Sequence, residues 1–178
     1  SDISSGWGGS SPGYPVGGLI PFGDRLLFVA GSSLWISDGT EAGTNLVRDG
    51  VFPKWDTLTF STPTVAGDRL FFRTDDVVHG WELWVTDGSE AGTHLVRDIY
   101  EGAAGSEGFM PPYTPLWMIP FGDRGFFAAN DGVHGVELWI SDGTEAGTVL
   151  VRDIFPGSTG AVRRQSVVFR NRLFFTAD

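Results

Sequence analysis

The chain contains one passage that is written three times with few changes. It reads "LWISDGTEAGTNLVRD" from Leu34, "LWVTDGSEAGTHLVRD" from Leu83 and "LWISDGTEAGTVLVRD" from Leu138. The repeated Trp therefore recurs roughly every 50 residues, a spacing typical of repeat architectures. Near-identical passages need near-identical surroundings, so the pattern predicts units that pack against one another in the same way.

Each unit divides into four short strand candidates. In the first unit these are "GGLIPF", the Arg-led run "RLLFVA", then "LWIS" and "TNLVRD". Val, Ile, Leu, Phe, Trp and Thr favour strands, whereas the Gly and Asp in the linking "GD" and "SDGTEAG" stretches favour turns. The Arg-led runs are nearly continuous in apolar residues, which predicts strands covered on both faces.

Four strands in a unit of about 40 to 50 residues are typical of a β-propeller blade. We therefore predict an all-β fold of β-propeller-type repeats with four-stranded antiparallel blades. About three and a half blades are present, because "RNRLFF" from Arg170 opens a fourth unit. The expected boundaries are about 16–49, 62–99 and 115–154 for the three blades and about 165–178 for the half blade.

These blades would form an incomplete ring within a single repeat domain over residues 1–178. Closed propellers have about four to eight blades, and an incomplete ring leaves open sheet edges that invite pairing. We expect the chain to be part of a longer polypeptide, or its ring to be completed by another chain.

Charge and composition restrict the partners. The formal charge is −10 and there is no Cys, which excludes disulfides and thiolate metal sites. The negative charge disfavours nucleic acids and anionic membranes, because both attract basic proteins. No apolar run approaches the roughly 20 residues of a membrane-spanning helix, so direct membrane insertion is not expected.

The stretches "GWELWVTDGSEAGTHLVRDI" from Gly80 and "GVELWISDGTEAGTVLVRDI" from Gly135 resemble the ELWxxDGT repeat family. These repeats occur in bacterial proteins and are propeller-like. The resemblance implies an extracytoplasmic location (periplasmic, cell-surface or secreted) and a noncatalytic scaffold. It carries no shared chemistry onto particular residues. The first unit departs from the pattern, since it reads "AGSSLW" without the His-Gly and Glu.

Three histidines are candidates for chemistry. His79 and His134 occupy matching places in "VVHG" and "GVHG", where a ligand or a base is one alternative. The favoured interpretation is a loop His that hydrogen-bonds backbone, because nothing nearby suggests a catalytic triad. His94 replaces Asn45 and Val149 of the other copies and is expected to be exposed.

The loops of the repeated passage concentrate carboxylates. Calcium binds six to eight oxygens, and each loop offers only an Asp, a hydroxyl and a Glu. Asp and Gly are also ordinary turn residues, so we predict no metal and no cofactor, with calcium as the alternative. The weak candidate ligands are Asp38, Glu41, Asp87, Glu90, Asp142 and Glu145. No one pair stands out as a glycosidase would require.

Repeated Arg and Trp residues are interpreted as structural. The arginines are expected to form salt links or hydrogen bonds between blades, with anion recognition as the alternative. The tryptophans are expected to pack in the core. The residues are Arg25, Arg69, Arg124 and Arg172 in the second strands, Arg48, Arg97 and Arg152 in the fourth, and Trp35, Trp84 and Trp139 in the third.

The unrepeated aromatics lie in Gly/Pro-rich insertions between units. Function on repeat scaffolds usually resides in such insertions, and exposed Trp and Tyr suit protein interfaces. The alternative is that each ring covers its own blade. The candidate binding residues are Trp7, Tyr14, Trp55, Tyr100, Phe109, Tyr113 and Trp117.

The leading prediction is a noncatalytic β-propeller scaffold that mediates protein–protein interaction, as an extrinsic subunit of a larger assembly. A carbohydrate-binding, lectin-like propeller is the alternative, and a hydrolase is the third. No catalytic residue is predicted.

Overall fold

The computed structural model describes residues 17–52, 63–102, 105, 118–157 and 162–177. Within these ranges every regular element is a β-strand and there is no helix, so no helix could cross a membrane. The strands form three four-stranded antiparallel sheets and one two-stranded hairpin. The predicted all-β class and the four-stranded antiparallel units are thus confirmed.

Chain order and spatial order agree within each sheet. The first sheet consists of β1 (Gly17–Phe22), β2 (Arg25–Ala30), β3 (Ser33–Ser37) and β4 (Asn45–Arg48). The second consists of β5 (Thr64–Ala66), β6 (Arg69–Asp75), β7 (Trp81–Thr86) and β8 (His94–Leu95). The third consists of β9 (Met118–Phe121), β10 (Arg124–Asn130), β11 (Val136–Ser141) and β12 (Val149–Arg152). The hairpin joins β13 (Val162–Phe169) to β14 (Arg172–Ala177).

The three sheets share one register. The repeated Trp lies opposite a Phe of the second strand in every sheet: Phe28 with Trp35, Phe72 with Trp84, and Phe127 with Trp139. The fourth strand shifts register at the same place in the first and third sheets, between the Leu and Trp of the "LW" pair. A repeated passage therefore produces a repeated geometry.

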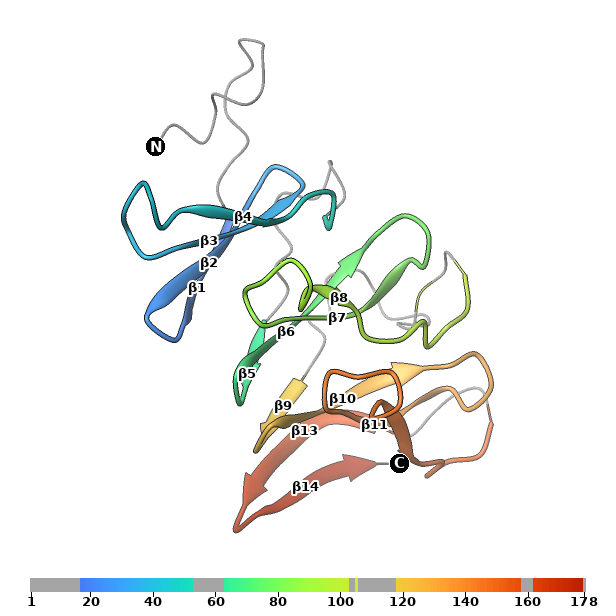
Figure 1. Cartoon of the computed structure of the whole chain (residues 1–178). Helices are drawn as coiled ribbons and strands as arrows, with labels where there is room; N and C mark the ends of the chain where they lie inside the picture. The colour runs from blue at the N-terminus through green and yellow to red at the C-terminus, as the bar shows by residue number, and fades with distance from the viewer. Residues whose placement is uncertain (1–16, 53–62, 103–104, 106–117, 158–161, 178) are drawn as a thin grey trace.

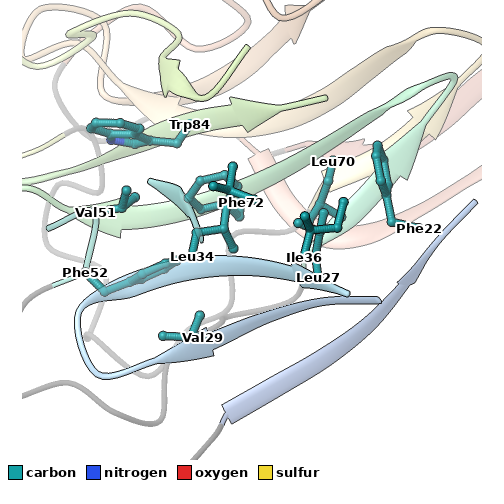
Figure 2. Close-up of a cluster of buried hydrophobic side chains, with 11 residues drawn as sticks. Phe22, Leu27, Val29, Leu34, Ile36, Val51, Phe52, Leu70, Phe72 and Trp84 are labelled. Atoms are coloured by element: carbon teal, nitrogen blue, oxygen red, sulfur yellow. The ribbon is translucent and has the colours of Figure 1, made fainter. Parts of the chain in front are cut away.

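The sheets are stacked in chain order, from β1–β4 to the hairpin (Figure 1). A hydrophobic core lies between the first and second sheets. It joins Leu27, Leu34 and Ile36 of the first sheet to Phe72 and Trp84 of the second, as Figure 2 shows. Burying such side chains contributes about 1.5–3 kcal/mol each.

A second core lies between the second and third sheets. Phe71, Leu83 and Val85 of the second sheet pack there with Phe127 and Trp139 of the third. Alternate residues of β6 and β7 thus enter different cores, and the second sheet is buried on both faces. This two-sided burial explains why β6 reads as a nearly continuous apolar run.

The outer side of the first sheet differs from the inner interfaces. Leu26 is 40% exposed, whereas Leu70, at the equivalent place in the second sheet, is fully buried. Leu46 is likewise 49% exposed. The described sheets thus form an open row instead of a closed ring, and the same sequence position is buried or exposed according to whether a neighbouring sheet covers it.

Candidate functional site

The loops of the repeated passage are organised by their Asp side chains. Asp38 Oδ1 accepts hydrogen bonds from the backbone N–H of Thr40 at 2.9 Å and from its hydroxyl at 2.7 Å. The Thr40 hydroxyl oxygen accepts in turn from the N–H of Gly43. The same bonds recur around Asp87 and Asp142.

These hydrogen bonds hold each Asp in its charged form. The hydroxyl of Thr40 lowers the pKa of Asp38, that of Ser89 lowers the pKa of Asp87, and that of Thr144 lowers the pKa of Asp142. One carboxylate oxygen per loop is thereby committed to the turn. The turn role proposed for these Asp residues is confirmed.

A metal at these loops would have few ligands. Across the described residues, no three His, Asp or Glu side chains lie close enough together to hold an ion. Glu41, Glu90 and Glu145 each close their turn through a backbone carbonyl, which accepts from the N–H of the Thr that ends the loop. Calcium binding stays an untested alternative.

The two loop histidines bind a side chain of their own loop, not the backbone as expected. His79 Nδ1 lies 2.6 Å from Asp76 Oδ2, and His134 Nδ1 lies 2.6 Å from Asp131 Oδ2. The other oxygen of each Asp accepts backbone N–H bonds from the same loop. The expectation was wrong because the loop places the Asp three residues before each His within hydrogen-bond distance of its ring.

Each Asp–His pair shifts the pKa of both of its members. The hydrogen bond with Asp76 raises the pKa of His79, and the one with Asp131 raises the pKa of His134. Burial opposes ionisation of Asp76 and Asp131, but the hydrogen bonds from the loop prevail and lower the pKa of both. The same Asp–His pair occurs in two different sheets, which indicates a structural role in holding the loop together. We call the pairs Asp76–His79 and Asp131–His134 the His clamps.

Arginines bridge neighbouring sheets in one direction. Arg48 of β4 donates to the carbonyl of Thr93 and lies 5.6 Å from the centre of the Trp84 ring. Arg97 repeats the contact in the next interface, donating to the Thr148 carbonyl at 2.9 Å and lying 5.7 Å from the Trp139 ring. Arg48 and Arg97 thus each reach the following sheet.

Two second-strand arginines, Arg25 and Arg69, also extend toward the following sheet. Arg69 donates to the carbonyl of Asp142 in the loop of the third sheet. The guanidinium of Arg25 lies near Gly88, at the corresponding place in the second sheet. Hydrogen bonds between units, predicted for the repeated arginines, are confirmed for Arg48, Arg69 and Arg97.

The repeated tryptophans are core residues where a sheet precedes them. Trp84 is 6% and Trp139 4% exposed, as expected. Trp35 has no preceding sheet among the described residues and is half-buried, stacked on Phe28 with ring centres 6.5 Å apart.

The Glu before each inner "LW" was not singled out from the sequence. Glu82 and Glu137 are fully buried. Glu82 accepts from the N–H of Tyr100 at 2.9 Å, and Glu137 accepts from the N–H groups of Ile154 and Phe155. The Glu thus ties the segment that follows the fourth strand to its own sheet, and its recurrence within the "ELW" motif was the available signal.

Of the predicted loop aromatics, only Tyr100 lies within the described residues. It is half-buried, and its ring lies against Gly132, where a Cβ would approach it to 3.0 Å. Tyr100 therefore contacts the loop between β10 and β11 of the third sheet. The remaining candidates, which lie outside the described residues, are Trp7, Tyr14, Trp55, Phe109, Tyr113 and Trp117.

A groove of about 410 Å³ lies between the second and third sheets. Its polar lining includes Arg69, Asp87 and His94 from the second sheet and Glu145 from the third. His94 is exposed, as predicted, with Nε2 3.3 Å from the carbonyl of Gly143. No Phe, Tyr or Trp of the described residues lines this groove, and its Arg and His already contact protein carbonyls.

The open face of the first sheet is a second candidate surface. We define it as Leu26, Phe28, Trp35 and Leu46, which share the register of the buried Leu70, Phe72, Trp84 and half-buried Leu95. Leu26 and Leu46 are exposed, Trp35 is half-buried, and Phe28 is buried. Leu26 and Leu46 were not predicted, because the repeat pattern alone does not say which copy lacks a neighbour.

No family model, curated protein or solved structure matches this chain.

Proposed function

We propose that the chain is a noncatalytic, β-propeller-type scaffold that binds a protein partner outside the cytoplasm. The resemblance of its repeats to the ELWxxDGT family supports the propeller arrangement and the location. The stacked sheets and their repeated contacts support a scaffold. We infer a protein partner because an apolar sheet face with exposed Leu and a half-buried Trp suits protein interfaces better than small polar ligands.

The polar side chains favour a scaffold over an enzyme. The repeated Asp, His and Arg groups are engaged in turns, loop clamps and contacts between sheets. Each arrangement recurs in more than one sheet. A catalytic constellation needs one particular set of groups at one place, so these repeated contacts argue against the hydrolase alternative.

The observation that carries the proposal is the exposure of the open face of the first sheet. Leu26 is 40% exposed against 0% for Leu70, and the two occupy one position of the repeat. The first sheet thus has a Leu at this position, as the second sheet does, although no described sheet covers Leu26. Exposed apolar side chains on one face of a sheet are typical of interaction sites.

A photoreactive amino acid at position 26 tests the proposal. Irradiation in extract of the source cells should link the chain to one protein, which mass spectrometry then identifies. Position 65 is the matched control, because Val65 is 41% exposed on the second sheet and lies outside the open face. The purified partner should bind the Leu26→Glu/Leu46→Glu variant at least tenfold more weakly than the original chain, because charge on the apolar face opposes its desolvation.

Two results would contradict the proposal. One is the same set of adducts from positions 26 and 65. The other is a partner that binds the doubly charged variant as tightly as the unaltered chain, since the open face would then lie outside the interface.

The carbohydrate-binding alternative predicts a similar weak site in every sheet. The groove between the second and third sheets offers donors and acceptors for hydroxyl groups. However, none of the lining residues described supplies a Phe, Tyr or Trp ring for a sugar to stack on. The protein-binding proposal is therefore the stronger of the two.

A further inference from the structure

The chain contains five Asp–Gly peptide bonds, all within the described residues. In an Asp–Gly pair the Gly nitrogen can attack the Asp side chain, because Gly has no Cβ to obstruct it. The reaction needs the nitrogen to face the carboxyl group of the Asp that precedes it. The five pairs are Asp38–Gly39, Asp49–Gly50, Asp87–Gly88, Asp131–Gly132 and Asp142–Gly143.

In four of these pairs the Gly amide faces another group. The repeated loops direct it at the hydroxyl group two residues earlier: Gly39 donates to Ser37 at 3.0 Å, Gly88 to Thr86 at 2.9 Å and Gly143 to Ser141 at 3.0 Å. Gly132 donates to the side chain of Asn130 at 2.8 Å. A nitrogen held in this way must first leave its hydrogen bond before it can attack its own Asp.

The pair Asp49–Gly50, directly after β4, has a different geometry. The Gly50 N–H donates to Oδ1 of Asp49 itself, at 2.9 Å. The Ser33 hydroxyl donates to the same oxygen at 2.5 Å, which holds the carboxyl group beside the Gly50 nitrogen. Both Asp49 and Gly50 are exposed to solvent. Loss of the Gly50 amide proton would therefore leave a lone pair directed at the Asp49 carboxyl group.

The other two sheets lack this pair. The residues equivalent to Asp49 are Asp98 and Asp153, and an Ile follows each of them, at Ile99 and Ile154. The β-branched side chain of Ile crowds the amide nitrogen that would have to attack. The arrangement at Asp49 is thus a departure of the first unit from the repeat and not a consequence of the shared geometry.

We propose that Asp49 is a site of spontaneous covalent modification, at which its peptide bond to Gly50 rearranges to an isoaspartyl bond. The Gly50 nitrogen gives its proton to solvent base and attacks Cγ of the protonated Asp49 carboxyl. The N–Cγ bond forms, the Cγ–OH bond breaks, and one water leaves with a cyclic imide remaining. Water then adds to the main-chain carbonyl of Asp49 and breaks its bond to the nitrogen, which leaves Gly50 linked through Cγ. No atom is oxidised or reduced.

The modification would lengthen the main chain between two anchored segments. Arg48, on one side, donates to the Thr93 carbonyl of the second sheet. On the other side Val51 and Phe52 are buried in the core between the first and second sheets. The Val51 carbonyl also accepts from the Thr74 hydroxyl at 2.7 Å. Because packed interiors tolerate small changes poorly, the extra methylene in the main chain should weaken the interface between these sheets.

Peptide mapping with electron-transfer fragmentation, which distinguishes isoaspartate from aspartate, tests the proposal. The 178-residue chain is incubated in mildly acidic buffer well below its Tm. Isoaspartate should accumulate at position 49 at least about tenfold faster than at the other four Asp–Gly bonds, since only there do the reacting groups face each other. In guanidinium chloride that unfolds the chain the five rates should converge, because the hydrogen bonds that distinguish the pairs are lost.

Two variants make the same change at different Asp–Gly bonds. Asp49→Glu should abolish the signal at position 49, because the larger ring that Glu would form closes slowly. Asp142→Glu should leave that signal unchanged. The incubated original chain should also have a lower Tm than fresh chain, and this loss should be smaller for the Asp49→Glu chain after the same incubation.

Three results would overturn the inference. They are the absence of isoaspartate at position 49, a faster rate at any of the other four bonds of the folded chain, and the same ratio of rates in the folded and unfolded chains. The inference does not rest on the proposed function. Photocrosslinking at position 26 tests that function separately.

Discussion

At the residue scale, the repeats act as controls for one another. Leu70 and Leu26 have the same sequence position and register but differ in exposure, 0% against 40%. Because both residues are Leu, a difference in the effect of mutating them reflects their surroundings and not the residue type. This makes the cost of burial directly measurable within one chain.

Leu70→Ala should reduce the free energy of unfolding by about 2–5 kcal/mol, because it leaves a cavity in the core between the first and second sheets. Leu26→Ala should cost less than about 1 kcal/mol, because the side chain is already part-exposed. Urea unfolding measures both. Equal losses would mean that the two sites are equally buried in solution.

Val77 sits in a backbone conformation that is unfavourable for its residue type. Its φ is 71°, and the equivalent residue of the third sheet is Gly132 with φ 80°. A β-branched residue is strained there, whereas Gly is not. Val77→Gly should therefore raise the free energy of unfolding by up to about 1 kcal/mol in urea titrations. A clear loss of stability would show that the 61% exposed Val77 side chain packs against something.

The His clamps predict a pH dependence with a definite sign. The pKa of His79 and His134 is raised in the folded chain by their Asp partners. Their stabilisation is therefore fully present below the unfolded His pKa and is lost as pH rises through the folded one. The pKa of Asp76 and Asp131 is lowered, so their contribution is lost on acidification below the ordinary Asp range.

The His79→Gln/His134→Gln variant should accordingly lose more Tm, relative to the original chain, at pH 5.5 than at pH 8.5. Differential scanning calorimetry at the two pH values measures this. His94→Gln is the control, because its ring contacts a backbone carbonyl and no carboxylate. A His-pair variant whose deficit is the same at both pH values would exclude the charged clamp.

At the scale of the element, the Asp-Gly-Thr/Ser loop is held together by hydrogen bonds among its own residues. Gly92 has no positive φ, so the conformation alone would admit Ala. A Cβ there would overlap the Asp87 carboxylate, however, which the hydrogen bonds from Ser89 hold in place. The glycine is needed for space and not for backbone freedom.

Gly92→Ala and Asp87→Ala should therefore be coupled. Each should lower stability, and the double variant should lose less than the sum, by about 0.5–3 kcal/mol, because the second change removes the overlap. Chemical denaturation of the four chains of this cycle gives the coupling. Gly50→Ala paired with Asp87→Ala should be additive, since Gly50 lies in another loop.

Most of the strands could be predicted from the sequence. The expected segments "GGLIPF" and "RLLFVA" coincide with β1 and β2, because turn residues bound them on both sides. "THLVRD" was expected as a strand, but β8 covers only His94–Leu95. The pairing continues past its end through a bond from Val96 N–H to the Leu83 carbonyl at 2.9 Å, which a local pattern does not reveal.

The candidate site was less predictable than the strands. The sequence predicted that the repeated arginines contact a neighbouring unit. It does not show whether each one reaches the preceding or the following unit. The buried Arg73 illustrates the same limit: it lies over the Trp81 ring, 4.4 Å from its centre, although Arg is rarely buried. Which copy of a repeated position is exposed depends on its neighbours in space.

At the scale of the whole molecule, the second sheet is the only one of the described sheets with a four-stranded neighbour on both faces. In stacked repeats, stability is a sum of unit and interface terms. The amides of β6 and β7 should therefore exchange hydrogen most slowly, and those of β13–β14 fastest. Hydrogen-exchange mass spectrometry measures this order. Uniform protection from β1 to β14 would instead indicate a single cooperative unit.

The forward reach of Arg48 and Arg97 gives the molecule a polarity. At each of these two interfaces the preceding sheet supplies a cation, and the following sheet supplies an aromatic ring and a carbonyl. Two copies related by a twofold axis would bring like sides together, so these contacts cannot join them symmetrically. Growth through these contacts must be head to tail, which leaves a ring or an open filament as the only products.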